Sequence, residues 1–125
     1  MSGTKYLLDT NAIIALLSGN KSIEEILSNA DWIGVSVISV LEFFSFPNLS
    51  VKDRLLFYTF LARIEIVDLS SSDFTYLENI TLHKVESGLK LPDAIIACTA
   101  IQKEATLISN DEDFKSINTV SLFRF

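Results

Sequence analysis

The sequence Lys5-Tyr6-Leu7-Leu8-Asp9-Thr10-Asn11 joins a short apolar run to a polar segment, and an apolar helical pattern follows from Ala12 to Leu17. A short apolar run that ends in polar residues is typical of a buried strand, and a capping residue before a periodic apolar stretch is typical of a helix start. The same succession recurs along the chain. Further strands are predicted at residues 32–37, 64–69 and 106–109, with a fifth, short strand at 120–123.

Helices are expected between these strands, and local capping signals indicate where they begin. Gly88 closes one of them, and the helix from Ala94 to Ile101 is apolar on every side, which predicts that it is buried. Strands that alternate with helices predict a mainly parallel sheet covered on both faces, a three-layer α/β sandwich. The expected helix starts are Ser22 in a capping box with Glu25, Ser36 or Ser39, Ser50 with Asp53, Ser70 to Asp73, and Pro92.

The composition is that of a folded, acidic protein. The 125 residues include 49 % apolar residues and carry a formal net charge of −6, which excludes disorder and argues against non-specific nucleic-acid binding by overall charge. The single Cys98 cannot form an internal disulfide and predicts a reducing, cytoplasmic location. No repeat or linker divides the chain, so one domain over residues 1–125 is expected, and no apolar stretch is long enough to span a membrane.

Four acidic residues fall where ligands bind in open α/β sheets, outside the carboxyl ends of the strands. Asp9 follows the first strand, Glu42 lies in the helix after the second, Asp93 opens the apolar helix, and Asp111 follows the fourth strand with Asp113 close behind. Each has an ordinary structural alternative. Asp9 could cap a helix, Asp93 could complement a helix dipole, and Glu42 could face solvent on an amphipathic helix. Their joint position at one sheet edge favours a functional site.

Carboxylates gathered in one crevice repel each other unless a positive charge lies among them. No lysine or arginine is adjacent to these acids in the sequence, although Lys90 and Lys115 are within a few residues. A hard divalent cation such as Mg²⁺ prefers oxygen ligands and can promote hydrolysis of a phosphodiester. The pattern therefore indicates metal-assisted phosphodiester hydrolysis. Without Asp9, Glu42, Asp93 and Asp111, the chain holds 12 acidic and 10 basic residues, so much of its acidity lies in this predicted site.

Four segments surround these acids and together extend from residue 7 to residue 114. They are Leu7-Leu8-Asp9-Thr10-Asn11, Ser39-Val40-Leu41-Glu42, Leu91-Pro92-Asp93-Ala94-Ile95-Ile96-Ala97, and Leu107-Ile108-Ser109-Asn110-Asp111-Glu112-Asp113-Phe114. In sequence and in order, these segments resemble the signature segments of PIN-domain ribonucleases, in particular the VapC-type toxins of toxin–antitoxin pairs.

The resemblance implies a ribonuclease that uses Mg²⁺, with Mn²⁺ as an alternative, and RNA as its substrate. It also implies a homodimer and a cognate antitoxin whose C-terminal segment occludes the acidic groove. Asp9, Glu42 and Asp93 are implied as catalytic, metal-binding carboxylates. The fourth acid is Asp111 or, as the second choice, Asp113. The remaining implied residues are Asn11 and Ser109, which would support the ligands or position a water.

Two departures from the family pattern leave parts of this interpretation open. The last segment has Ser109 where threonine is common, and it carries two aspartates, so the fourth ligand is ambiguous. Basic residues form no run, which argues against a broad RNA-binding face.

The sequence also allows interpretations other than a nuclease. His83 is expected to be a surface or packing residue, and Cys98 a small core residue within the apolar helix. A phosphoacceptor signalling domain would also be a small acidic α/β protein, but such a domain pairs acids near its first strand and has a lysine after its last strand. Here Asp9 stands alone after Leu7-Leu8, and Ser109-Asn110 occupy the late position. A PIN-like binding module that has lost catalysis remains the other alternative.

Overall fold

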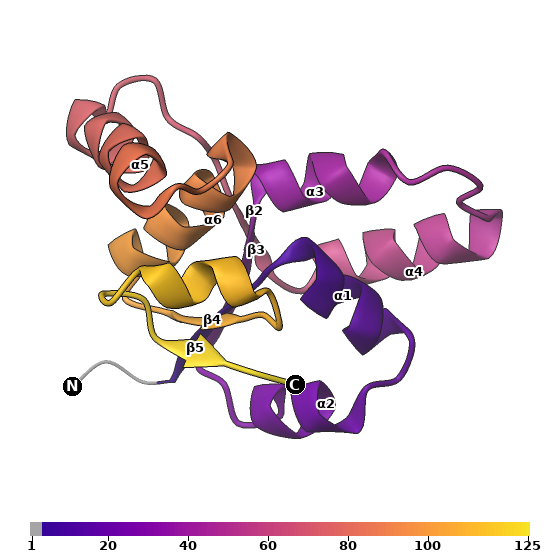
Figure 1. Cartoon of the computed structure of the whole chain (residues 1–125). Coiled ribbons are helices and arrows are strands. Elements are labelled where there is room, and N and C mark those ends of the chain that lie inside the picture. The colour runs from indigo at the N-terminus through magenta and orange to yellow at the C-terminus, as the bar shows by residue number, and fades with distance from the viewer. Residues whose placement is uncertain (1–3) are drawn as a thin grey trace.

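The computed structural model describes residues 4–125, and a five-stranded sheet at its centre separates two layers of helices (Figure 1). Residues 1–3 of the predicted domain lie outside this description. The elements are β1 (Lys5–Leu8), α1 (Thr10–Leu17), α2 (Lys21–Leu27), β2 (Trp32–Ser36), α3 (Val37–Phe44), α4 (Val51–Leu61), β3 (Glu65–Val67), α5 (Phe74–Ser87), α6 (Leu91–Gln102), β4 (Thr106–Ile108), the 3₁₀ helix η1 (Glu112–Ser116) and β5 (Leu122–Phe123).

The strand order is β3-β2-β1-β4-β5, and all four pairings are parallel. The predicted α/β sandwich with a parallel central sheet is therefore confirmed. Leu7 of the central strand pairs with Gly34 on one side and with Leu107 on the other. The chain proceeds outward from β1 to β3 and then returns to β4 on the opposite side of β1. This reversal creates the kind of crevice in which open α/β sheets bind ligands, at the carboxyl ends of β1 and β4.

Each face of the sheet is covered by its own apolar core, because neighbouring strand residues point in opposite directions. Leu7 and Leu107 pack with α5, α6 and Phe114 of η1. Leu8 and Ile108 pack instead with side chains of α1, α2, α3 and α4. Figure 1 shows the same division, with α5 and α6 on one side of the sheet and α1 and α4 on the other. Both faces of the two central strands are buried at their carboxyl ends, which explains why β1 and β4 each end in two consecutive apolar residues.

Most of the capping predictions are confirmed. Ser50 and Asp53 form a complete capping box at α4, and Gly88 takes the left-handed conformation that ends α5. Of the two serines considered for α3, Ser36 is the cap, because its hydroxyl accepts a hydrogen bond from Ile38 N at 3.1 Å. Ser39 is fully buried within the helix.

The predicted start of α2 at Ser22 is wrong. Asn20 caps this helix, since its side-chain oxygen accepts a hydrogen bond from Ile23 N at 3.0 Å, and Ser22 lies inside the first turn. Asparagine is as good an N-cap as serine, and here it directly follows Gly19, which takes a positive φ at the end of the preceding turn. The backbone is thus ready to enter the helix two residues earlier than the Ser22 pattern indicates.

Helix α6 is the buried helix that its composition predicts, with every residue from Ala94 to Ala100 buried. Pro92 lies in its first turn, where a missing N–H costs nothing. Between residues 4 and 125, no helix combines the length and the apolar character needed to cross a membrane.

Candidate metal centre

Asp9 leaves the central strand and caps the helix that follows it. Its Oδ1 accepts a hydrogen bond from Ala12 N at 2.7 Å, and its backbone N–H donates to Ile108 O of the neighbouring strand at 3.2 Å. The side chain is only 5 % exposed. The helix-capping alternative therefore holds for Asp9, but the same geometry also fixes a buried carboxylate at the carboxyl end of the sheet.

Asp111 and Asp113 are placed by the turn between β4 and η1. The buried Ser109 hydroxyl accepts a hydrogen bond from Asp111 N at 3.0 Å, and Asp111 Oδ1 accepts one from Asp113 N at 2.9 Å. Phe114 is buried in the core and anchors the 3₁₀ helix against the sheet. The two aspartates thus lie on a short, internally hydrogen-bonded turn.

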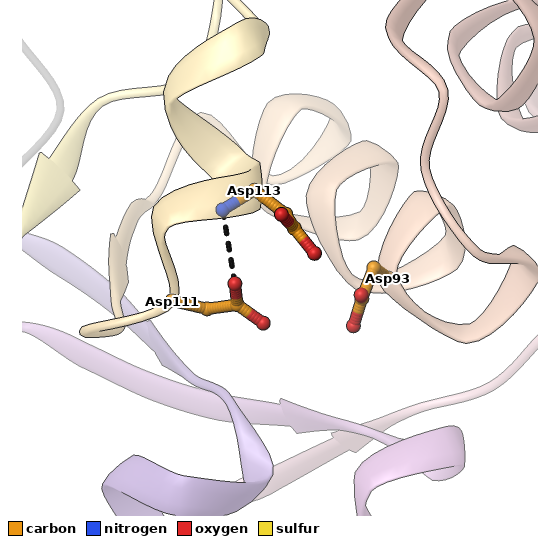
Figure 2. Close-up of side chains that lie close together, drawn as sticks. All are labelled: Asp93, Asp111 and Asp113. Carbon is orange, nitrogen blue, oxygen red and sulfur yellow. Dashed lines mark hydrogen bonds between the residues drawn. The ribbon is translucent and has the colours of Figure 1, made fainter.

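Asp93 comes to the same place from the first turn of α6. Figure 2 shows its carboxylate opposite those of Asp111 and Asp113, which approach it from η1 and the turn before η1. One carboxylate oxygen from each of the three residues lies within 4.8 Å of the others. Residues far apart in the sequence therefore present three oxygen donors to one small volume.

Glu42 lies beside Asp9 in an adjoining groove whose wall is formed by α1 and α3. Thr10 Oγ1 donates a hydrogen bond of 2.6 Å to Glu42 Oε1, which joins the start of α1 to α3. Asn11 lines the same groove and is exposed. Leu41 and Phe46 provide apolar parts of its wall. Glu42 and Asp9 thus flank the Asp93–Asp111–Asp113 cluster rather than belong to it.

Burial and mutual repulsion make ionisation unfavourable at this edge of the sheet. Burial, and then the charges of Asp111 and Glu42, raise the pKa of Asp93 to about 6. Burial also raises the pKa of Asp9, and the hydrogen bonds from Ser109 and Ala12 oppose that rise. The negative charges of Asp111 and Glu42 raise it further. The charges of Asp111 and Glu42 therefore disfavour ionisation of both Asp9 and Asp93.

No basic side chain relieves this repulsion in the described part of the chain. The ion pairs of residues 4–125 join other residues, and none includes Asp9, Glu42, Asp93, Asp111 or Asp113. Uncompensated carboxylates that are partly buried and close together fit a divalent cation with oxygen ligands, because the ion supplies the missing positive charge. The donor set is entirely oxygen, which suits Mg²⁺ or Mn²⁺ rather than a thiol-seeking metal.

The structure brings all the predicted acids to one edge of the sheet. The two predicted supporting residues, Ser109 and Asn11, differ in their contacts. Ser109 is buried between Asp9 and Asp111 and contacts the Asp111 backbone. Within residues 4–125 the Asn11 side chain forms no hydrogen bond, and Asp9 is held by Ala12 instead. The role predicted for Asn11 therefore remains a prediction.

Sequence reasoning missed Thr10, the donor that orients Glu42. Thr10 belongs to the first signature segment, but a threonine at the first position of a helix carries no signal of a partner 32 residues away. Only the pairing of β1 with β2, which sets α1 beside α3, makes this contact foreseeable.

Comparisons with known proteins identify relatives of this fold. The family model described as "PIN domain" matches residues 6–120. A chain of the Rickettsia felis VapBC2 structure, bound to a promoter DNA fragment, is 26 % identical with a TM-score of 0.77, and the match covers 98 % of this chain and 99 % of that one. A chain of a Klebsiella pneumoniae toxin–antitoxin complex is 28 % identical with a TM-score of 0.76, over 92 % of this chain and 94 % of that one.

A more distant structure shares the fold alone. A chain of VapBC-5 from Mycobacterium tuberculosis is 20 % identical with a TM-score of 0.68, and the match covers 98 % of this chain and 99 % of that one. A search of curated proteins found no significant match to the chain.

Proposed function

The chain belongs to the PIN domain family, and on that premise we propose that it is a divalent-metal-dependent endoribonuclease and the toxin of a toxin–antitoxin pair. One observation carries the proposal: Asp93, Asp111 and Asp113 place carboxylate oxygens within 4.8 Å of one another and have no basic partner in the described structure. Stability alone does not explain such a cluster, because it costs free energy unless a cation binds. We take residues 1–125 as one nuclease domain.

All five carboxylates would help to hold the ion, from two neighbouring positions at the edge of the sheet. Asp93, Asp111 and Asp113 would provide oxygen ligands for Mg²⁺ or Mn²⁺, and Asp9 and Glu42 would add carboxylate ligands from the adjoining groove. The bound ion would polarise the scissile phosphodiester and make a water easier to deprotonate. Both Asp111 and Asp113 are included as ligands, because both approach Asp93.

The protein's own contribution is to fix these acceptors before the substrate arrives. Ala12 and Ser109 hold Asp9, and the Thr10 hydroxyl holds Glu42 through a short hydrogen bond to a carboxylate, a strong type of contact. Carboxylates held in this way do not have to reorganise when charge develops on the phosphate oxygens. Because overall basic charge is scarce, RNA selection would depend on backbone shape and unpaired bases.

An apolar surface on α4 supports the partner part of the proposal. Val51, Leu55 and Tyr58 are exposed by 74 %, 61 % and 55 % respectively, which is unusual for adjacent large apolar side chains on one helix. The Klebsiella and Rickettsia relatives come from toxin–antitoxin assemblies. We therefore propose that the chain forms a homodimer and binds a cognate antitoxin that covers the acidic groove. We also propose a cytoplasmic location, where the protein would meet RNA.

The direct test is RNA cleavage by the purified, partner-free protein. We expect cleavage of single-stranded or structured RNA in Mg²⁺ or Mn²⁺, complete loss in EDTA, and recovery when the metal is returned. The Asp93→Asn variant, purified identically, controls for contaminating nucleases. Equal cleavage by this variant, or robust cleavage in EDTA, would contradict the proposed metal mechanism.

The toxin role has its own test in living cells. Expression of the chain alone should arrest growth, and co-expression of a small adjacent gene should restore it. The Asp93→Asn variant should be harmless at the same expression level. Strong expression of the wild-type chain without any growth effect would favour the binding-module alternative.

A further inference from the structure

The last residues of the chain clasp the turn that carries Asp111 and Asp113. Asn110 Nδ2 donates to Phe125 O at 2.6 Å, and Phe125 N donates back to Asn110 Oδ1 at 2.8 Å. Arg124 Nη2 donates to Asn110 O at 3.2 Å. These contacts follow directly from β5, whose pairing with β4 brings residues 124 and 125 beside the turn (Figure 1).

Arg124 also forms an ion pair with Glu112, which lies between Asp111 and Asp113 in the sequence. Its Nη2 atom is 2.8 Å from Glu112 Oε1, and Lys115 Nζ is 2.7 Å from Glu112 Oε2. Hydrogen bonds and charge from these two bases lower the pKa of Glu112. Glu112 is thereby paired on the outside of the turn, while its neighbours Asp111 and Asp113 face Asp93.

These contacts of Arg124 and Phe125 with Asn110 and Glu112 form a clasp. The clasp is the main support that residues 110–112 of the turn receive from another segment. Among the described residues, every hydrogen bond from residues 110–112 to another segment goes to Arg124 or Phe125. On either side, the turn is anchored by the buried residues Ser109 and Phe114. The exposed part between these anchors therefore depends on the clasp for its position.

We propose that Asn110 and Arg124 are positioning residues that hold Asp111 and Asp113 close to Asp93 and so prepare the cation site. The inference rests on the proposed metal-dependent function and adds residues that do not themselves contact the ion. Repulsion among the three carboxylates favours an outward movement of the turn, and the clasp opposes that movement. Residues that orient metal ligands in this manner usually affect metal affinity measurably.

The test measures metal binding without RNA. Wild-type protein, Arg124→Ala and Asn110→Ala are stripped with a chelator and then titrated with Mn²⁺ alone, and the melting temperature is followed. We expect each variant to need about 3–10-fold more Mn²⁺ for half of the maximal stabilisation, at or below the smallest effect usual for ligand-orienting residues, because these contacts are exposed. Arg124→Lys should fall between the wild type and Arg124→Ala, because lysine keeps the charge near Glu112 but lacks the rigid, planar donor group of arginine.

Hydrogen exchange separates positioning from a general structural role. In Arg124→Ala, the amides of residues 110–113 should exchange faster than in wild type without metal and regain protection in saturating Mn²⁺. Arg63→Ala removes another exposed arginine, and it should change neither the exchange nor the Mn²⁺ midpoint.

The outcomes distinguish this inference from the proposed function. If wild-type protein responds to Mn²⁺ and Arg124→Ala responds with the same midpoint, the positioning role is wrong and the metal site stands. If Arg124→Ala raises only the KM for RNA, Arg124 is a substrate contact and the inference is equally overturned. If wild-type protein shows no response to Mn²⁺, the metal site and the clasp's role fail together.

Discussion

Two regions of this molecule each present an aspartate at a helix N-terminus beside a pocket, but only one of them gathers carboxylates that lack a basic partner in the described structure. Asp9 caps α1 at the carboxyl edge of the sheet, and Asp73 caps α5 beside a cavity between α5 and α6. The local role of the two side chains is the same. Their surroundings differ in how the negative charge and the polar atoms are satisfied.

Around Asp73, the protein provides a partner for each carboxylate oxygen. Oδ1 accepts from Tyr76 N at 3.1 Å, and Oδ2 accepts from Gln102 Nε2 at 2.9 Å. Tyr76 and Thr99 share a buried hydrogen bond of 2.6 Å between their hydroxyl oxygens. This region is complete without a ligand, and its hydrogen bonds join α5 to α6.

The titratable residues of the α5–α6 cavity also lack catalytic features. Burial raises the pKa of the Cys98 thiol to about 11, so the reactive thiolate is scarce at neutral pH. His83 lines the cavity from α5, away from the acidic crevice. At the carboxyl edge, by contrast, carboxylates repel each other and no base pairs with them in the described structure. The carboxyl edge of the sheet is the candidate functional site because its charges are unpaired, and not because a pocket lies beside it.

The largest expected effect comes from the same substitution made in both regions. Asp9→Asn should reduce metal-dependent RNA cleavage by at least about 10³-fold, because an amide neither carries the charge nor binds a hard cation as well as a carboxylate. Asp73→Asn should leave cleavage unchanged. Asparagine caps helices as well as aspartate does, so both variants should remain folded.

Single-turnover cleavage and circular dichroism would check this pair of variants. Full activity in Asp9→Asn would remove Asp9 from the site. A comparable loss in Asp73→Asn would show that the two regions are coupled and that the contrast between them is false.

The second-largest expected effect is a pH dependence of the stability of the metal-free protein. The pKa of Asp93 rises from 3.8 to about 6 on folding, so between these values the folded state binds more protons than the unfolded state. Stability therefore falls as pH rises from about 4 to 6, and this group accounts for well under about 3 kcal/mol of the loss, because solvent screens a half-buried carboxyl group.

Urea unfolding in EDTA at several pH values would measure this loss. Asp93→Asn should remove most of it and should be more stable than wild type at pH 7 without metal. The raised pKa of Asp9 should leave a smaller slope of the same sign. Identical slopes in wild type and Asp93→Asn would contradict the electrostatic account of the crevice.

The sequence allowed the framework of the site to be predicted, because the framework depends on local patterns. Asp9 and Asp111 each follow a short apolar strand, and Asp93 opens an apolar helix after a proline-marked start. Parallel strands then bring their carboxyl ends to one edge. The position of these acids thus required only the order of strands and helices.

The contacts that orient the acids could not be predicted in this way. Thr10 reaches Glu42 and Arg124 reaches Glu112 through side chains whose partners depend on how neighbouring elements pack. The capping error at α2 has a similar origin, since Asn20 and Ser22 both suit a cap and only the preceding turn selects between them. Local patterns specify elements, and tertiary packing specifies their pairwise contacts.

A smaller effect tests whether the orientation of Glu42 matters. Thr10→Val removes the hydroxyl that donates to Glu42 but keeps the shape of the side chain, and we expect about a 10-fold lower kcat with little change in KM. Thr10→Ser should retain most of the activity. The matched control is Thr59→Val, which removes an exposed hydroxyl that bonds only its own helix at Leu55 O. An unchanged kcat in Thr10→Val would show that Glu42 needs no such support.

The smallest effect belongs to the satisfied region and should appear in stability alone. Tyr76→Phe removes the hydroxyl that contacts Thr99, while the Thr99 hydroxyl keeps its hydrogen bond of 2.7 Å to Ile95 O. Because one buried partner remains satisfied, urea unfolding should show a loss of about 1 kcal/mol. RNA cleavage and the Mn²⁺ midpoint should match wild type, since Tyr76 lies on the helices that cover one face of the sheet and not at its carboxyl edge. A fall in cleavage beyond the loss of folded protein would mean that α6 transmits changes in this region to Asp93 at its start.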